Sequence, residues 1–295
     1  MNRQRIDLPY RPPLAWRELT AFLAPRATPG IEEITPELYS RNALVGDRLV
    51  RLEARPRAGS DSLLLEVVEP SGCPLEAAQL SDLTGRARRL FDLDCDPAAI
   101  ATVLGADPTL APLVAARPGL RVPGAWSGFE TAVRAILGQQ VTVRGATTLC
   151  GRLVDSYGPS KSGARLFPEP RTLARARFPR VGLTGARAAT IRALASACAS
   201  GELCLDTGAD PVATVAGLKR IRGIGDWTAQ YIAMRVLRLA DAFPSGDLGL
   251  LRAANVLIRP RPGSSPLLPG DLRRLAEPWR PFRAYAALHL WHSLG

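Results

Sequence analysis

The most restrictive feature of this sequence is a short glycine turn between two helical segments. Residues 211–219 have the composition of a short helix, and apolar residues recur at helical spacing from Trp227 onward. Gly223 and Gly225 lie between the two segments. Glycine can adopt positive φ and leaves its backbone bare, so the N–H groups that open the second helix are able to face a phosphate. The segment predicts either a phosphate-binding hairpin or an ordinary turn between helices.

The charge of the chain favours the phosphate-binding interpretation. The formal net charge is +11 over 295 residues, and the only two lysines are Lys161 and Lys219. Lys219, Arg220 and Arg222 flank the glycine turn. Arginine suits bidentate contacts to phosphate, so the expected partner is a polyanion such as nucleic acid. An arginine-rich composition can also be a genomic habit, and charge alone therefore does not establish this partner.

A single acid, Asp247, follows a Gly/Pro-rich loop about twenty residues beyond the turn. The loop is Phe243-Pro244-Ser245-Gly246, and a helical segment begins directly after the acid. Aspartate is a good helix N-cap, which is the structural interpretation of this residue. The alternative is a catalytic carboxylate, and the nearby glycine turn favours it.

These two segments together resemble the helix-hairpin-helix and Gly/Pro-Asp signature of base-excision DNA glycosylases. The match runs through Ile221–Gly225, the loop at 243–246 and Asp247. The resemblance implies that Asp247 is the catalytic carboxylate and that the hairpin holds DNA. The implied DNA-backbone contacts are Gly223, Ile224, Gly225, Thr228 and Arg222. It also implies a Na⁺ or K⁺ ion on the backbone carbonyls of Lys219, Ile221 and Ile224, and no required cofactor.

Members that also cut the DNA strand carry a lysine two residues beyond the second hairpin glycine. Trp227 occupies that position here. An indole cannot act as an amine nucleophile, so the resemblance implies hydrolysis without AP lyase activity.

Further strings place the resemblance in the 3-methyladenine DNA glycosylase II (AlkA) family. They are Tyr10-Arg11-Pro12-Pro13 with Trp16, residues 117–124, residues 134–141 and the tail from Trp279. The implied fold class is α+β, with a small TATA-binding-protein-like α/β domain at residues 1–85. An all-α helix-hairpin-helix glycosylase domain pair is expected at residues 86–295, with the hairpin at about 211–239 and the acid loop at 243–247. Strands are predicted at 48–54 and 63–68, and helices only beyond residue 83.

Positions that match the family's base pocket carry Trp227, Tyr231, Trp291 and Phe22, with Leu248 after the acid. Each of these aromatic residues, taken alone, is more typical of a hydrophobic core. Glycosylases extrude the target nucleotide and fill the hole with a side chain, which the resemblance places at Gln140. Glutamine is a polar departure from the apolar wedge expected there, and an ordinary helix–helix turn is the alternative.

The N-terminal residues lack the apolar core of a signal peptide, and no apolar run approaches a membrane span. We therefore expect a cytoplasmic, nucleoid-associated monomer. The five cysteines have no zinc-like spacing and are expected to be reduced and structural. His289 and His292 are expected to be packing or surface residues, and 258–266 reads as an inserted loop.

The function predicted from these features is a monofunctional DNA glycosylase acting on double-stranded DNA that contains alkylated bases. The expected substrates are 3-methyladenine and 7-methylguanine. Two alternatives remain open at this point: a non-catalytic module that binds damaged DNA, and a glycosylase for uracil, hypoxanthine or oxidised purines.

Overall fold

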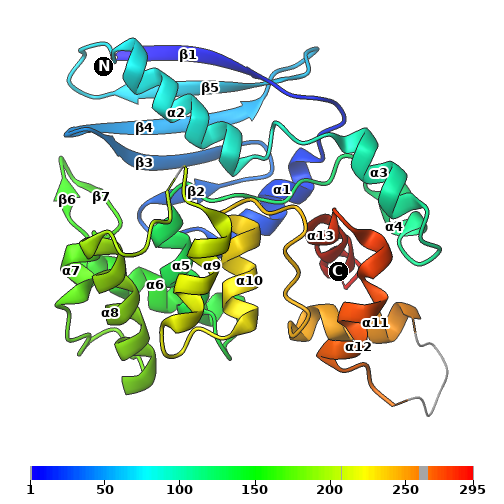
Figure 1. Ribbon diagram of the computed structural model, residues 1–295. Helices are drawn as coiled ribbons and strands as arrows, with labels where there is room; N and C mark the ends of the chain where they lie inside the picture. Colours follow the sequence, from blue (N-terminus) through cyan, green and yellow to red (C-terminus); the bar gives the residue numbers. More distant parts are fainter. Residues whose placement is uncertain (1, 207, 259–264, 295) are drawn as a thin grey trace.

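The N-terminal part of the chain is an antiparallel sheet covered by helices. The computed structural model describes residues 2–206, 208–258 and 265–294. The strands are β1 (Asn2–Pro9), β2 (Glu32–Ile34), β3 (Tyr39–Val45), β4 (Arg48–Pro56) and β5 (Ser62–Glu69). They are ordered β1-β5-β4-β3-β2 (Figure 1). Every second side chain of β4 from Val50 to Ala54 is buried, as expected for a sheet with one face on the core.

Two helices accompany this sheet, and the helical part of the molecule follows. The first two are α1 (Trp16–Leu23), followed by the short turn η1 (Ala24–Arg26), and α2 (Ala77–Leu90). The helices between α2 and the glycine turn of the hairpin are α3 (Pro97–Gly105), α4 (Ala111–Ala116), α5 (Gly128–Leu137), α6 (Val143–Tyr157), α7 (Pro170–Ala174), α8 (Gly185–Ser200) and α9 (Pro211–Arg220). The rest are α10 (Asp226–Arg235), α11 (Leu248–Ile258), α12 (Pro269–Leu275), η2 (Glu277–Trp279) and α13 (Arg283–His292).

Hydroxyl caps fix the starts of three helices on which the site depends. Ser127, Thr142 and Thr184 each accept a backbone N–H three residues later, at α5, α6 and α8. Ser127 and Glu130 have the spacing of a capping box, but only the Ser127 side chain makes a capping bond. Glu130 turns away from the cap because Arg41 and Thr28 bind its carboxylate.

Two hydrophobic cores lie on either side of a cavity. The first joins the sheet and α2 to the C-terminal helices α11 and α13, through residues such as Leu52, Leu83 and Leu250. The second is formed by α5–α10 and includes Ile136, Ile191 and Ile232. The chain therefore returns to the first core after it has built the second, and in Figure 1 the helices α11–α13 lie beside α10.

The predicted strands at 48–54 and 63–68 are confirmed, and β1, β2 and β3 were missed. The expectation of helices only beyond residue 83 is wrong at one place. Two-residue strands β6 (Ser160–Lys161) and β7 (Ala164–Arg165) pair across a turn in which Gly163 has φ 79°. The domain boundary expected after residue 85 falls inside α2, and the division itself remains a prediction.

The five cysteines are free thiols, but Cys73 and Cys204 are exposed, so a structural role does not hold for these two. Most of the expected insertion at 258–266 lies outside the described residues. No helix in the described part of the chain has the length and apolar character needed to cross a bilayer.

Candidate active site

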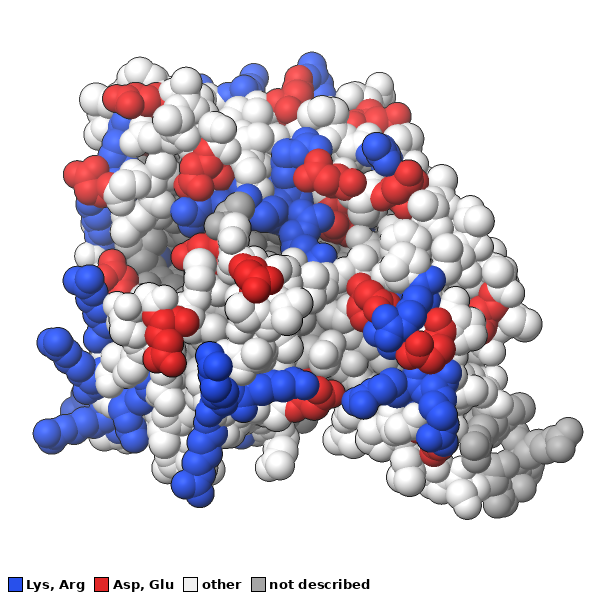
Figure 2. Space-filling view, viewed as in Figure 1, with Lys and Arg blue, Asp and Glu red and all other residues white. Residues whose placement is uncertain are grey.

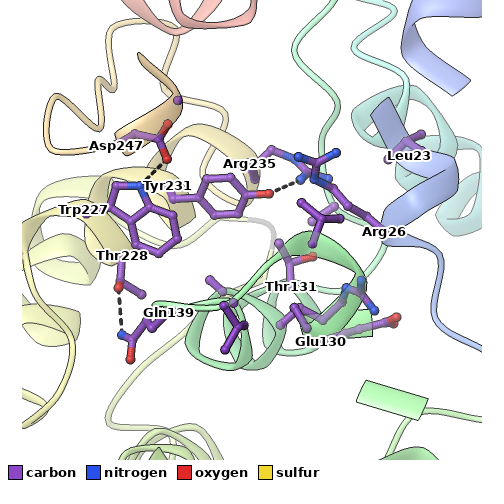
Figure 3. Close-up of a pocket in the computed structure, with 18 of the residues that line it drawn as sticks. Leu23, Arg26, Glu130, Thr131, Gln139, Trp227, Thr228, Tyr231, Arg235 and Asp247 are labelled. Carbon is purple, nitrogen blue, oxygen red and sulfur yellow. Dashed lines mark hydrogen bonds between the residues drawn. The ribbon is translucent and has the colours of Figure 1, made fainter. Parts of the chain in front are cut away.

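A cavity of about 1420 Å³ separates the two cores and contains most of the predicted site residues. Its walls come from the start of α5, the α5–α6 turn, the hairpin, α10, the Asp247 loop and α13. Six of the predicted residues that line it are Asp247, Trp227, Tyr231, Trp291, Leu248 and Gln140. Figure 3 shows Asp247, Trp227 and Tyr231 on one wall, facing Arg26 and Glu130 across the cavity.

Asp247 stands immediately before α11 and makes three hydrogen bonds through its carboxylate. Oδ1 accepts the Leu250 N–H at 2.9 Å, so the residue is a helix N-cap as well as a cavity residue. The Trp227 Nε1 donates to Oδ2 at 2.8 Å, and the Trp291 Nε1 donates to Oδ1 at 2.8 Å (Figure 3 draws the first). Among the described residues no cation pairs with this carboxylate. The two indoles therefore fix its orientation and leave its charge uncompensated.

Trp227 and Tyr231 form an aromatic wall on α10. They are four residues apart on one helix and therefore lie on the same face. Their rings stack with centroids 5.6 Å apart and planes at 17°. Both rings line the cavity, so a planar group that enters beside Asp247 meets an aromatic surface.

Two arginines that sequence analysis did not assign lie at the edge of this wall. Arg235 is buried, and its Nη1 donates to the Tyr231 hydroxyl at 2.8 Å. Burial by itself would raise the pKa of the Tyr231 phenol, but the guanidiniums of Arg235 and Arg26 outweigh burial and lower that pKa. Burial lowers the pKa of Arg26. The sequence signal that could have identified Arg235 as a site residue is its spacing of four residues from Tyr231 on α10.

The remaining predicted pocket residues take different positions. Phe22 does not line the cavity, because its ring packs 6.2 Å from Trp291 and is covered by the Arg26 guanidinium at 3.8 Å. Phe22 therefore packs against Trp291 and is not part of the cavity wall. Leu248 is 81 % exposed and stands at the rim.

The hairpin has the bend that its glycines predict. Gly223 has φ 97°, and a Cβ there would collide with Thr190 Oγ1, so only glycine fits. A Cβ on Gly225 would meet no atom within 4 Å, so this side of the turn is open. Arg222 is exposed, whereas the Thr228 side chain is buried and its hydroxyl accepts a bond from Gln139. Thr228 also lines the cavity, and its contact with DNA through the backbone stays a prediction.

The carbonyls implied for a monovalent cation can be tested against the hydrogen bonds of the turn. The Ile221 carbonyl accepts the Ile224 N–H at 3.0 Å and has one lone pair left. No hydrogen bond from the described residues ends on the carbonyls of Lys219 or Ile224. Carbonyl oxygens without a donor fit a hard monovalent ion.

The α5–α6 turn is fastened to the hairpin. Gln139 Nε2 donates to the Gly223 carbonyl at 2.8 Å and to Thr228 Oγ1 at 2.9 Å (the second is drawn in Figure 3). Gln140 follows with φ 56° and an exposed side chain at the cavity. The predicted wedge is therefore presented by a turn that the hairpin holds, and sequence analysis missed the holding residue, Gln139.

The opposite end of the cavity is a buried ion-pair network that joins the sheet to α5. Arg41 on β3 pairs with Glu130 at 3.1 Å and with Glu32 at 3.3 Å. Burial disfavours charge on Glu32, but Arg41 and the Tyr39 hydroxyl lower its pKa. Burial likewise opposes charge on Arg41, yet Tyr39 and the two carboxylates raise its pKa. Arg41, Glu32 and Glu130 therefore each have a partner of opposite charge.

Comparison with known proteins places the chain in a family. The AlkA N-terminal domain family matches residues 5–127. The "Probable bifunctional transcriptional activator/DNA repair enzyme AlkA" of Mycobacterium tuberculosis (strain ATCC 25618 / H37Rv) is 39% identical over 98% of this chain and 57% of that protein. The chain thus spans little more than half the length of that relative.

A second relative matches along its whole length. "DNA-3-methyladenine glycosylase 2" of Escherichia coli (strain K12) is 35% identical over 98% of this chain and 97% of that protein. The solved 3-methyladenine DNA-glycosylase from Archaeoglobus fulgidus has a TM-score of 0.77 at 20% identity, covering 98% of this chain and 97% of that one, and so shares the fold. On these matches, the chain belongs to the AlkA family of DNA-3-methyladenine glycosylases.

Proposed function

We propose that this protein is a DNA glycosylase that hydrolyses the N-glycosidic bond of alkylated purines, 3-methyladenine and 7-methylguanine among them, in double-stranded DNA. The observation that carries the proposal is Asp247: an unpaired carboxylate, oriented by two indoles, beside a stacked aromatic wall. The name of the Escherichia coli relative supports 3-methyladenine as a substrate, and that of the Mycobacterium tuberculosis relative supports a role in DNA repair.

The chemistry follows from the charge that develops as the base leaves. The sugar acquires oxocarbenium character, and an uncompensated carboxylate beside it stabilises that positive charge and orients water. Because Trp227 and Trp291 hold the two oxygens, Asp247 needs little reorganisation during the reaction. An alkylated purine that carries positive charge is already a good leaving group and binds well against the faces of Trp227 and Tyr231.

Binding to the strand is assigned to the hairpin and to the basic surface around it. The backbone of residues 223–225 would hold a phosphate, with a Na⁺ or K⁺ ion on the carbonyls of Lys219, Ile221 and Ile224 supplying positive charge when bound. Figure 2 shows basic side chains projecting from the lower edge of the molecule. Exposed arginines of the α6–α10 region that make no ion pair within the described chain are Arg144, Arg152, Arg171, Arg175, Arg177, Arg180, Arg220 and Arg222.

Gln140 is proposed to enter the stack when the target nucleotide leaves it. Its side chain is exposed at the cavity, and the turn is held to the hairpin through Gln139. A polar wedge fills the gap through its aliphatic stem. We also propose that the protein acts as a monomer and works where chromosomal DNA is found.

Absence of AP lyase activity is part of the proposal. Trp227 stands where strand-cutting relatives carry an amine, and its indole N–H is already committed to Asp247. Borohydride treatment during turnover should therefore trap no covalent protein–DNA adduct. A trapped adduct would contradict this point and leave base release unaffected.

The proposal is tested by incubating the protein with a panel of duplex oligonucleotides, each carrying one lesion, and measuring free base. Release of 3-methyladenine or 7-methylguanine is expected. Release of only uracil, hypoxanthine or an oxidised purine would keep the chemistry and change the substrate. Tight binding with no release from any duplex would leave a non-catalytic damage-binding module.

A further inference from the structure

One acidic side chain lies inside the basic hairpin. Asp226 is the first residue of α10, directly after the open turn at Gly225. Its neighbours Lys219, Arg220 and Arg222 are all basic and exposed. A carboxylate at this position repels a DNA phosphate that approaches the turn, so its presence needs an explanation beyond DNA contact.

The carboxylate of Asp226 does not cap its own helix and instead binds two cations from other helices. Lys219 Nζ, in the last turn of α9, lies 2.6 Å from Oδ1. Arg273 Nη2, on α12, lies 3.2 Å from Oδ2. The side chains of these three residues are 45%, 44% and 57% exposed, so solvent and a bound strand can reach them all.

Arg273 has a second contact that connects this network to the catalytic loop. Its Nη2 also donates to Ser245 Oγ at 3.2 Å, two residues before Asp247. A cavity of about 200 Å³ lies between α10 and α12 beside Asp226 and Arg273, which leaves the arginine room to move. Two cations therefore flank the hairpin and are held in place by one anion.

We propose that Asp226 is an internal substitute for a DNA phosphate, which sets how strongly the hairpin binds undamaged DNA. Without DNA it holds Lys219 and Arg273; with DNA these two cations leave it for phosphates. This inference rests on the proposed function, since it requires DNA at the hairpin. Binding then includes breaking two ion pairs, and nonspecific affinity is lower than the arginine content of the surface would give.

The first test compares Asp226→Asn with the wild type in binding an undamaged duplex over a series of salt concentrations. The variant is expected to bind about fivefold to tenfold more tightly at low salt, with a slope of log K against log salt steeper by about 0.9, the value for one additional released counterion. Asp82→Asn is the matched control, because Asp82 is equally exposed at 45% and pairs with Arg86 on α2. It should bind like the wild type.

The second test reads the exchange directly in the wild-type protein. Since Lys161 and Lys219 are the only lysines, ¹³C-dimethylation gives two lysine signals besides that of the terminal amine. Addition of undamaged duplex should shift the Lys219 signal and leave that of Lys161, on β6, in place. Unchanged affinity and slope in Asp226→Asn, or a Lys219 signal that does not respond to bound DNA, would overturn the inference alone. Failure of the wild type to bind DNA even at low salt would overturn the proposed function together with it.

Discussion

The two ends of the cavity use carboxylates in opposite ways. At the α5 end, Glu32 and Glu130 share Arg41, and their remaining oxygens accept hydrogen bonds from the backbone N–H and the hydroxyl of Thr28. At the α11 end, the donors to Asp247 within the described residues are all neutral N–H groups. The first end joins two parts of the chain, and the charges of its two carboxylates are already paired with Arg41. The second end keeps a negative charge available, as stabilising a cationic sugar requires.

Removing the shared cation should produce the largest effect on stability. Arg41→Met leaves two buried carboxylates without a cation, and the free energy of unfolding should fall by about 3–5 kcal/mol. Denaturant titration measures this loss. The control is Arg17→Met, because Arg17 and Glu37 form an exposed pair whose loss should cost less than about 1 kcal/mol. If the two substitutions lowered the free energy of unfolding equally, the buried ion pairs of Arg41 would contribute no more to stability than an exposed pair.

The free energy of unfolding should depend on pH through His289, a buried histidine on α13, the helix that also carries Trp291. Burial lowers the pKa of His289 on α13 to about 4, against about 6.5 in an unfolded chain. Above pH 6.5 neither state holds the proton. As the pH falls from 6.5 to 4 only the unfolded chain is protonated, so stability should decrease by about 2–3 kcal/mol by pH 4.5.

This pH effect is checked by denaturant titration of His289→Gln at pH 7.5 and 4.5. The difference in stability between the two pH values should shrink by that amount relative to the wild type. His292→Gln, in the same helix and only half-buried, is the control and should keep most of the wild-type difference, because burial is the main cause of the lowered pKa of His289. If His289→Gln lost as much stability between pH 7.5 and 4.5 as the wild type does, protonation of His289 would not be the cause of that loss.

The indole donors provide a sharper comparison within the cavity. Trp227→Phe or Trp291→Phe keeps an aromatic ring and removes one hydrogen bond to the Asp247 carboxylate. Single-turnover base excision should slow by about tenfold, the size expected for one bond to a charged group. Trp126→Phe is the control, because Trp126 lines the α5 end of the same cavity and contacts Arg41 instead. A similar slowing in all three variants would mean that the indoles act through packing alone.

The smallest expected effect belongs to the proposed wedge. Gln140→Ala removes the side chain that would fill the stack, and excision from duplex DNA should slow by about threefold to fivefold. Excision from a single strand with the same lesion should be unchanged, since no partner stack has to be filled. Equal slowing on both substrates would assign Gln140 a role other than the wedge.

Local sequence patterns were sufficient to predict the parts of the site whose residues lie close together in the chain. The bend at Gly223 and Gly225 and the position of Asp247 at a helix start are both present as predicted. Each depends on a few adjacent residues whose backbone or capping preferences are strong. The edge strands β1 and β2 were missed, because they carry few apolar residues and therefore have a weak pattern.

Contacts across the chain could not be predicted in the same way. Arg41 and Glu130 are 89 residues apart, and Trp291 is 44 residues from Asp247. No periodicity or motif pairs such residues; only the fold brings them together. The same limit explains Phe22, which matched the pocket by resemblance but packs against Trp291 and does not line the cavity.

The central claim is that the uncompensated carboxylate of Asp247 drives base departure. The most direct measurement is single-turnover excision by Asp247→Asn on a duplex with one 3-methyladenine or 7-methylguanine, together with its affinity for that duplex. Asparagine keeps the size of the side chain and removes its charge. We predict excision slower by about 10²–10³-fold with affinity within about twofold of the wild type. Excision at the wild-type rate would contradict the account.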